Sequence, residues 1–422
     1  MLAMLGAAFV VVAMARLPLA IAAFTVLTFP AHLPGSLGAG ATLAKPVGAL
    51  LVLAWGAAVL TRRVTRPVLP QARPLLFSVT VGLLLLAGAS VLWAADAGQT
   101  RTAFGRFVLN AALLLVTYTA ASTRAGFRTV VHGYLLASVV TSTYSLASGH
   151  YIASGRLGGL FDPNYFAAEL IPAIVIACFL FATTGSPRLR WLFAAVAAVD
   201  LAAFALTQSR GGIVGLAVGL LAAVVFAGPA RSRILALVLA LAAVGVGYYF
   251  GYKPAHVFQG TSRAGLSGTT SGRLDEWRVA LRVFSGHPVG GVGLGNYQVV
   301  EPSFATQTLN LSTVRQIVTD RLVVHNTYLQ MAAELGLLGL CLFLAVLVLP
   351  LRMAGRALGR LDRSLDELEF HARGLLAGAA GMLVAYVFLS AEFEKPLWLV
   401  LALLAAVPAL LGGDGGDESS TT

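Results

Sequence analysis

The chain has 422 residues, of which 58% are hydrophobic and 11% are charged, and its mean hydropathy is +0.83. Soluble domains carry roughly 25% charged residues, so this composition excludes a soluble globular protein. The apolar runs are continuous rather than alternating, which indicates transmembrane helices rather than a transmembrane barrel. The net charge is +11, but the basic residues follow a membrane topology, so we predict no nucleic-acid partner.

The first apolar run, residues 7–29, has no basic segment ahead of it and no clear cleavage site. We therefore predict a first helix that is retained rather than a signal peptide. This run is long and contains Arg16 and Pro18, which allow a break in the helix at that point. Cys178 and Cys341 lie inside later apolar runs, so the sequence predicts neither a disulfide framework nor a thiolate metal site.

Apolar runs long enough to cross a bilayer of about 30 Å recur along the chain. We predict about twelve transmembrane helices, which cover residues 7–29, 43–61, 75–94, 102–122, 126–148, 162–183, 188–207, 211–228, 232–250, 327–350, 372–391 and 396–412. Basic residues cluster in every second connection, namely Arg62, Arg63, Arg66, Arg73, Arg124, Arg128, Arg188, Arg190, Arg231, Arg233, Arg352, Arg356, Arg360, Arg363 and Arg373. Basic connections face the cytoplasm, so we predict a multi-pass membrane protein with both termini cytoplasmic.

One hydrophilic segment, residues 251–324, separates the ninth span from the tenth. The alternation of basic connections places this segment on the side away from the cytoplasm. The predicted fold class is an all-α integral membrane protein with one periplasmic helical loop domain. Its parts are spans one to nine in residues 1–250, the loop domain in 251–324, spans ten to twelve in 325–412 and a disordered cytoplasmic tail in 413–422.

The loop domain begins with a polar, glycine-rich stretch that ends at Thr270, and we predict a mobile loop there. The sequence SGRLDEWRVALRVFSG then predicts an amphipathic helix. We assign its apolar contacts to Leu274, Trp277, Val279, Leu281 and Phe284. The glycine run GVGLGN that follows is not a nucleotide-binding loop, because no strand precedes it. We predict a second surface helix after Tyr297.

Chargeable residues gather at the outward ends of the spans and in the loop domain. They are Arg156, Arg210, Arg273, Arg321 and His325. Each arginine alone is explained equally well as an interfacial residue that reaches lipid head groups. Together, guanidinium groups bind phosphate oxygens in pairs, and an imidazole kept neutral by nearby positive charge suits proton abstraction from a sugar hydroxyl. The set therefore predicts a diphosphate site with a general base.

Helical spacing would place Arg321, His325 and Tyr328 on one face, and we predict that Tyr328, Asn326 and Glu334 support the site. Outside this cluster, the two glycines after Arg210 are predicted to let the backbone approach a ligand.

The acids within and next to the spans have simpler explanations. Asp162, followed by Pro163 and Asn164, is predicted to cap the next helix rather than to bind a metal. The outer face has no Asp-x-Asp pair to hold a divalent metal, so we predict no metal and no cofactor. Glu169 and Asp200 lie inside spans, and each is either a buried partner for an arginine or a polar contact between helices.

Four segments, in this order and separated by spans, resemble the superfamily of O-antigen ligases and O-antigen polymerases of bacteria. They are GRLGGLFDPNYFA, SRGGIVGLAVGLL, SGRLDEWRVALRVFSGHPVGGVGLGNY and HNTYLQMAAELGLLG, within residues 150–350. The resemblance implies a metal-independent, inverting glycosyltransferase of the GT-C type in the inner membrane, with its site facing the periplasm. By matching position it also implies His325 as the base, Arg210 and Arg273 as ligands of the diphosphate and Arg156 as an assisting residue.

The resemblance further implies a donor glycan on undecaprenyl diphosphate, a saccharide acceptor and contact with membrane lipids. A ligase attaches finished O-antigen to lipid A–core, and this is the activity we expect. A polymerase, which joins repeat units still on the lipid carrier, is the alternative, and transfer to protein serines is a third. A transporter is the alternative from another class, but the sequence has no internal repeat and its charges lie at one face of the membrane.

Overall fold

The computed structural model describes residues 2–29, 44–61, 68–149, 156–157, 162–252, 270–308, 322–361 and 366–411. Within these residues the backbone forms helices and turns, without a strand, so the predicted all-α fold class is confirmed. Three predicted features lie outside the described residues. They are the mobile loop between residues 253 and 269, Arg321 and the tail 413–422.

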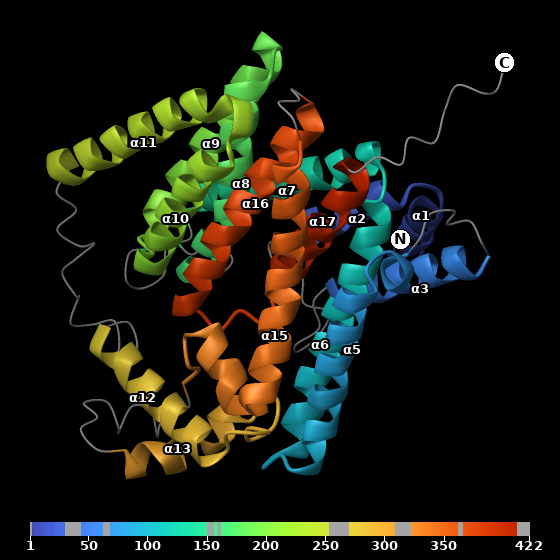
Figure 1. Cartoon of the computed structure of the whole chain (residues 1–422), viewed down its shortest axis with the longest axis vertical. Helices are drawn as coiled ribbons and strands as arrows, with labels where there is room; N and C mark the ends of the chain where they lie inside the picture. Colours follow the sequence, from blue (N-terminus) through green and yellow to red (C-terminus); the bar gives the residue numbers. More distant parts are fainter. Residues whose placement is uncertain are drawn as a thin grey trace.

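The helices follow one another along the chain as Figure 1 shows. They are α1 (Leu2–Ala15), α2 (Leu17–Thr28), α3 (Ala44–Leu60), α4 (Leu69–Ala72), α5 (Pro74–Ala89), α6 (Ala97–Ala120), α7 (Arg124–Ser148), α8 (Pro163–Thr183), α9 (Pro187–Thr207), α10 (Arg210–Phe226), α11 (Arg231–Tyr252), α12 (Thr270–Gly286), α13 (Tyr297–Gln307), α15 (Thr327–Gly359), α16 (Glu367–Ala385) and α17 (Lys395–Leu411). Short 3-10 turns extend α5 and α16 and precede α11.

Each predicted span contains one of these helices. Among the described residues, eight helices are long and apolar enough to cross a membrane, and four apolar helices are shorter. The first predicted span is divided at Arg16, whose φ of −144° and ψ of 69° separate α1 from α2. The predicted break is therefore confirmed, and Pro18 follows it in the first turn of α2, where a missing N–H has no cost.

Helices α8 and α16 form the centre of the bundle. In their most apolar stretches, 83% of the residues of α8 and 78% of those of α16 are buried, against 11% in the stretch that includes the start of α11. In Figure 1, α3 and α11 extend outward on opposite sides of the bundle. Helix α10 packs closely on α16, because a Cβ on Gly215 would lie 2.7 Å from the carbonyl oxygen of Gly381. Small residues at such a contact let two helix backbones approach each other.

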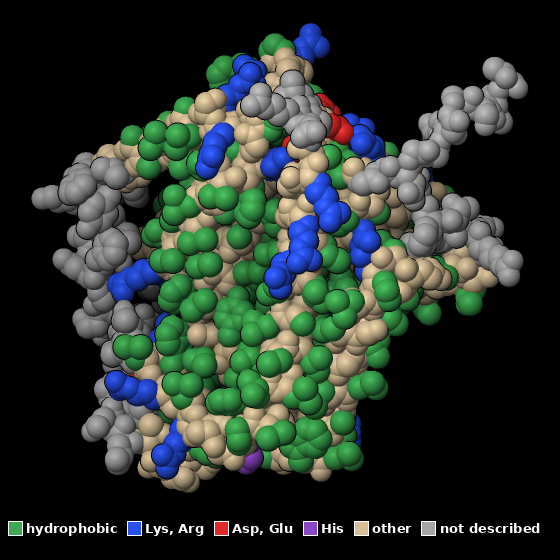
Figure 2. Space-filling view, in the orientation of Figure 1, with side chains coloured by type: hydrophobic (Ala, Val, Ile, Leu, Met, Phe, Trp, Pro, Cys, Tyr) green, Lys and Arg blue, Asp and Glu red, His purple; other side chains and the backbone are tan. Residues whose placement is uncertain are grey.

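The surface agrees with a chain that sits in a bilayer. Figure 2 shows a broad band of hydrophobic side chains, with Lys and Arg side chains gathered at its upper edge and a few more at the lower left. At the upper edge, where α16 begins, ion pairs tie it to α7. Arg124 contacts Asp366, and Arg128 lies 3.2 Å from Glu367. These exposed pairs contribute little stability by themselves.

The loop domain is built from α12 and α13, which pack on the start of α15 at the lower end of Figure 1. Its buried core consists of Val279, Ala280, Val283, Val292, Tyr297, Ala305, Val324 and Ala333. The amphipathic helix and the second surface helix are thus confirmed, but the predicted apolar face is partly wrong. Leu274 and Leu281 are 45% and 50% exposed, because α12 turns Ala280 and Val283 inward instead.

The glycine run after α12, residues 290–295, packs against a kink in α15 and so holds the loop domain there. Gly336, with φ of 67° and ψ of −167°, interrupts the helical backbone, and the amide of Leu337 donates to the carbonyl of Pro288 over 2.8 Å. Gly291, also at positive φ, lies so close to Glu334 that a Cβ would come within 2.3 Å of its backbone. The run therefore serves helix packing, and α13 begins directly after it.

We expect Gly336→Ala to destabilise the protein strongly. A Cβ there would lie 2.1 Å from the carbonyl oxygen of Val289, at a backbone φ that L-residues rarely adopt. Strain of this kind costs about 1–3 kcal/mol before the clash is counted, so we expect the thermal midpoint in detergent to fall by about 5 °C or more. Gly105→Ala is the control, because its Cβ would meet nothing within 4 Å. An equal midpoint for the two variants would contradict this account.

Candidate active site

Four segments that are far apart in the sequence meet beside the loop domain. They are the residues around Arg156 and Asn164, the first turn of α10, the first turn of α12 and the turn before α15. The charges of Arg156, Arg210 and Arg273 act on one another, and the charge of Arg273 also acts on His325. The fold therefore brings four of the five residues in the predicted cluster together.

A hydrogen-bond network fixes Arg156 against the turn between α9 and α10. Its Nε donates to the carbonyl of Thr207 over 2.8 Å, and its Nη2 donates to Oδ1 of Asn164 over 2.8 Å. The same Asn164 oxygen accepts from the hydroxyl of Ser209 over 2.9 Å. Because these bonds hold the guanidinium in place, its charge is presented to the site in one orientation.

Arg210 is the first residue of α10, and Ser209 caps that helix by accepting from the amide of Gly212. A helix N-terminus carries a partial positive charge, which adds to the charge of the arginine. The prediction that the following glycines admit a ligand is wrong. A Cβ on Gly211 would lie 2.7 Å from Phe388, and one on Gly212 would lie 2.8 Å from Ala167, so both glycines serve helix packing.

Arg273 lies in the first turn of α12, and its buried Nε has no hydrogen-bond partner among the described residues. Burial is the main cause that lowers the pKa of both Arg273 and Arg156, and the neighbouring arginines lower both further. Nearby carboxylates oppose this change, namely Glu276 and Asp162 for Arg273 and Asp162 for Arg156. Both guanidiniums stay charged at neutral pH, because the ordinary pKa of an arginine lies far above neutrality. Like charges held together in this way favour the binding of an anion between them.

His325 lies in the turn before α15, with its side chain 23% exposed and its backbone at a φ of 51°. Few residues other than glycine adopt this conformation, and such strain is concentrated at functional sites. Burial and, to a smaller extent, the charge of Arg273 lower the pKa of His325 to about 4, against the opposing effect of Asp162. The imidazole is thus neutral at pH 7 and able to accept a proton.

The three predicted supporting residues make contacts that hold the helices around the site. Asn326 caps α15, since its Oδ1 accepts from the amides of Tyr328 and Leu329, each over 3.0 Å. The helix therefore begins at Thr327, after the histidine, so the predicted helical stacking of His325 and Tyr328 is wrong. The hydroxyl of Tyr328 donates to the carbonyl of Leu383 over 2.7 Å and ties α15 to α16.

Glu334 is 1% exposed and lies against the glycine run rather than against the arginines. Its Oε2 accepts from the amide of Gly295 over 2.7 Å, and its Oε1 accepts from Nε2 of Gln330 over 3.3 Å. This carboxyl thus holds the loop domain on α15, and any influence on the site acts through the fold.

The two acids inside spans have partners other than arginine in the described part of the chain. Asp200 accepts from the hydroxyls of Ser138 and Ser142, each over 2.7 Å, and so joins α9 to α7. Glu169 is 2% exposed and hydrogen-bonds the carboxyl of Glu394. Both are polar contacts between packed elements, the second of the two alternatives that the sequence left open.

Two residues beside the cluster do not stand out in the sequence. The predicted cap that includes Asn164 is confirmed by the bond from its amide to Asp162 Oδ1 over 2.8 Å, but the side chain of Asn164 also holds Arg156. Glu276 is completely buried, one turn after Arg273, and its Oε2 lies 4.0 Å from Nε2 of His325. The acidic doublet in SGRLDEW was the available signal, because a glutamate that an amphipathic helix turns inward needs a charged neighbour.

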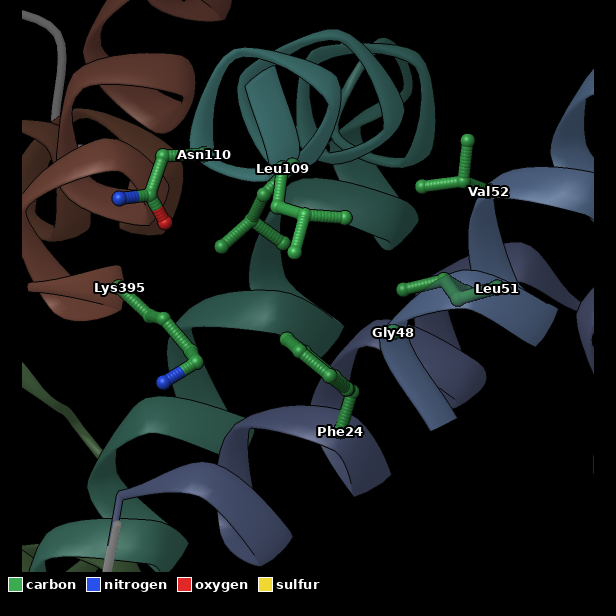
Figure 3. Close-up of a pocket in the computed structure, with 8 residues that line it drawn as sticks. Phe24, Gly48, Leu51, Val52, Leu109, Asn110 and Lys395 are labelled. Atoms are coloured by element: carbon green, nitrogen blue, oxygen red, sulfur yellow. The ribbon is translucent and has the colours of Figure 1, made fainter. Parts of the chain in front are cut away.

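An apolar pocket lies apart from this cluster, between α2, α3 and α6 (Figure 3). It is lined by Phe24, Gly48, Leu51, Val52, Leu109, Asn110, Leu113 and Lys395. The side chain of Lys395 extends toward this space in Figure 3. Its lining suits a hydrocarbon chain and includes neither His325 nor any of the site arginines, so the chemistry discussed here is located elsewhere. Among the described residues, no three His, Cys, Asp or Glu side chains come together as ligands for a metal ion.

Comparison with known proteins identifies the segment that builds most of this site. Residues 193–344 match the family model described as O-Antigen ligase, which is a little over a third of the chain. No curated protein matches the sequence. The matched segment includes α9, α10, the loop domain and the first half of α15, and with them Arg210, Arg273 and His325. Residues 193–344 are therefore similar to the O-antigen ligase family, and this match supports the superfamily of O-antigen ligases and O-antigen polymerases that the sequence motifs resemble.

Proposed function

We propose that this protein is an O-antigen ligase that transfers a glycan from undecaprenyl diphosphate to a hydroxyl of lipid A–core. One observation carries the proposal. A neutral histidine lies beside Arg273, whose charge in turn repels those of Arg156 and Arg210. Such a site attracts a lipid-borne diphosphate and offers a proton acceptor beside it, which are the two requirements of this transfer.

In the proposed reaction, Arg210 and Arg273 bind the diphosphate and Arg156 assists from its fixed position. The acceptor oxygen attacks the anomeric carbon while its proton passes to His325, and the bond from that carbon to the diphosphate oxygen breaks. The bonding electrons go to the diphosphate, whose developing charge is stabilised by the guanidinium groups. Attack from the side opposite the leaving group inverts the anomeric centre, and the arginines take the role that a divalent metal has in other diphosphate sites.

We propose further that the enzyme lies in the bacterial inner membrane, with both termini in the cytoplasm and the site at the periplasmic face. The connections rich in arginine support this orientation. In Figure 1, helices α12 and α13 of the loop domain lie at the opposite end of the bundle from the start of α16, where Asp366 and Glu367 pair with Arg124 and Arg128. In membrane vesicles oriented with the periplasmic face outward, a labelled donor supplied only on the outer side should then be consumed.

Purified protein tests the activity directly. We would supply undecaprenyl-diphosphate-linked repeat units with a labelled sugar, with and without lipid A–core. A ligase moves the label to lipid A–core and leaves the carrier lipid behind. Growth of a ladder without lipid A–core would establish a polymerase instead, and a label that stays on its carrier under all conditions would contradict glycosyl transfer altogether.

A further inference from the structure

Glu276 is a buried acid on α12, one turn after Arg273. It is 0% exposed, and neither carboxyl oxygen has a hydrogen-bond partner among the described residues. Its neighbour Asp275 differs, because that carboxyl pairs with Arg278 over 3.1 Å. A buried group left without a partner costs free energy, so it persists where a ligand or a reaction uses it.

His325 is a group close to this carboxyl that can exchange a proton with it. The atoms concerned are Oε2 of Glu276 and Nε2 of His325, 4.0 Å apart. That distance is too long for a hydrogen bond, but catalytic bonds are often long before substrate binds and shorten in the complex. The other ring nitrogen, Nδ1, is buried and without a partner in the described part of the chain.

The surroundings of Glu276 come from three elements. Arg273 and Asp275 lie on its own helix, Glu301 faces it from α13 and His325 faces it from the turn before α15. The hydroxyl of Tyr297, also on α13, donates to the backbone carbonyl of Glu276 over 3.3 Å and fixes this part of α12. Burial is the main cause that raises the pKa of Glu276 to about 8; Arg273 opposes this rise and Asp275 contributes to it.

We propose that Glu276 is the proton-accepting partner of His325 in the transfer reaction. When Glu276 is a carboxylate, Nε2 of the ring carries the hydrogen and points it at Oε2, which leaves the lone pair of Nδ1 for the acceptor hydroxyl. The acceptor O–H bond breaks as Nδ1–H forms, and the Nε2–H bond breaks as Oε2–H forms. The imidazole ends neutral, and the proton rests on Glu276 until it exchanges with water.

This inference rests on the proposed function and deepens it. A histidine whose pKa is about 4 is a poor final holder of a proton at neutral pH, whereas a carboxyl whose pKa is about 8 holds it well. In this pair the imidazole of His325 accepts the proton from the substrate, and the carboxyl of Glu276 then holds it. When Glu276 is protonated it cannot accept a proton from His325. The transfer rate should therefore rise with pH, with a midpoint near the pKa of Glu276.

The test is the pH dependence of transfer in Glu276→Gln, with labelled undecaprenyl-diphosphate-linked repeat units as donor and lipid A–core as acceptor. We expect kcat to fall by about 100-fold or more, and the rise of rate centred near pH 8 to disappear. Glutamine keeps the size and cannot take up a proton. The affinity for undecaprenyl diphosphate, measured by itself, should stay within about threefold of the wild type, because less than 1 kcal/mol separates values that close.

Glu301→Gln is the matched control. Its carboxyl is equally buried, interacts with the backbone of Leu322 and belongs to the same loop domain. We expect it to keep both the rate and the rise with pH. A Glu276→Gln enzyme with a normal rate and pH profile would overturn the proposal, as would equal losses in the two variants, which would mean a structural role. If His325→Ala is also fully active, the proposed function itself fails, so the two failures are distinguishable.

Discussion

Replacing His325 by alanine is expected to abolish glycosyl transfer while the protein still inserts and folds. In the proposed reaction the imidazole is the general base, and a positioned general base typically accelerates a reaction by about 100- to 10,000-fold. Its side chain makes no hydrogen bond within the described residues, so its removal should not disturb the bundle. Transfer of labelled glycan, normalised to the amount of monodisperse protein, measures the loss.

The control for this variant is His287→Ala. His287 is an exposed histidine of the same loop domain, and its ring lies against Phe304 with 6.0 Å between the ring centres. We expect this variant to transfer at the wild-type rate. Full activity of His325→Ala would remove that residue as the base, and the proton would then have to leave through another group.

Conservative replacement of the arginines is expected to weaken donor binding without changing the net charge. Lysine in place of Arg210 or Arg273 keeps one positive charge but loses the planar fork that binds two phosphate oxygens. A hydrogen bond to a charged group contributes about 1.5–3 kcal/mol, and 1.4 kcal/mol corresponds to about a tenfold change. We therefore expect the KM for the lipid-linked donor to rise by about 10- to 100-fold, with the acceptor KM nearly unchanged.

Arg282→Lys supplies the matched control for Arg273→Lys. Arg282 lies on the same helix, α12, but its side chain is exposed on the side away from the buried core. We expect donor KM to stay at the wild-type value in this variant. Equal donor affinity in all three lysine variants would mean that the diphosphate is bound elsewhere.

Much of the architecture could be predicted because each span is encoded locally. A run of apolar residues is long enough to cross a bilayer whatever the rest of the chain does. The break at Arg16, the cap at Asp162 and the helix after Tyr297 are similarly local, since each depends on residues within one or two turns. The apolar face of α12 was partly wrong, because the choice between Leu281 and Val283 depends on what packs against the helix.

The site was predictable only as a set of residues. Arginines at outward ends of spans indicated a common function, and the structure brings Arg156, Arg210, Arg273 and His325 together. Their partners were not predictable, because Asn164 and Glu276 look like an ordinary cap residue and an ordinary helix acid in the sequence. The glycines after Arg210 were misinterpreted because glycine serves ligand approach and helix packing equally well.

The sequence by itself determined that this is a helical membrane protein, where its helices lie and which arginines and histidine are unusual, since hydropathy and charge act along the chain. The tertiary structure alone decided that Glu276 faces His325 and that Glu334 does not. Helix α12 and the turn before α15 meet only because Gly291 and Gly336 let the glycine run dock on the kinked helix. Contacts between segments separated by about fifty residues depend on packing, which no local pattern contains.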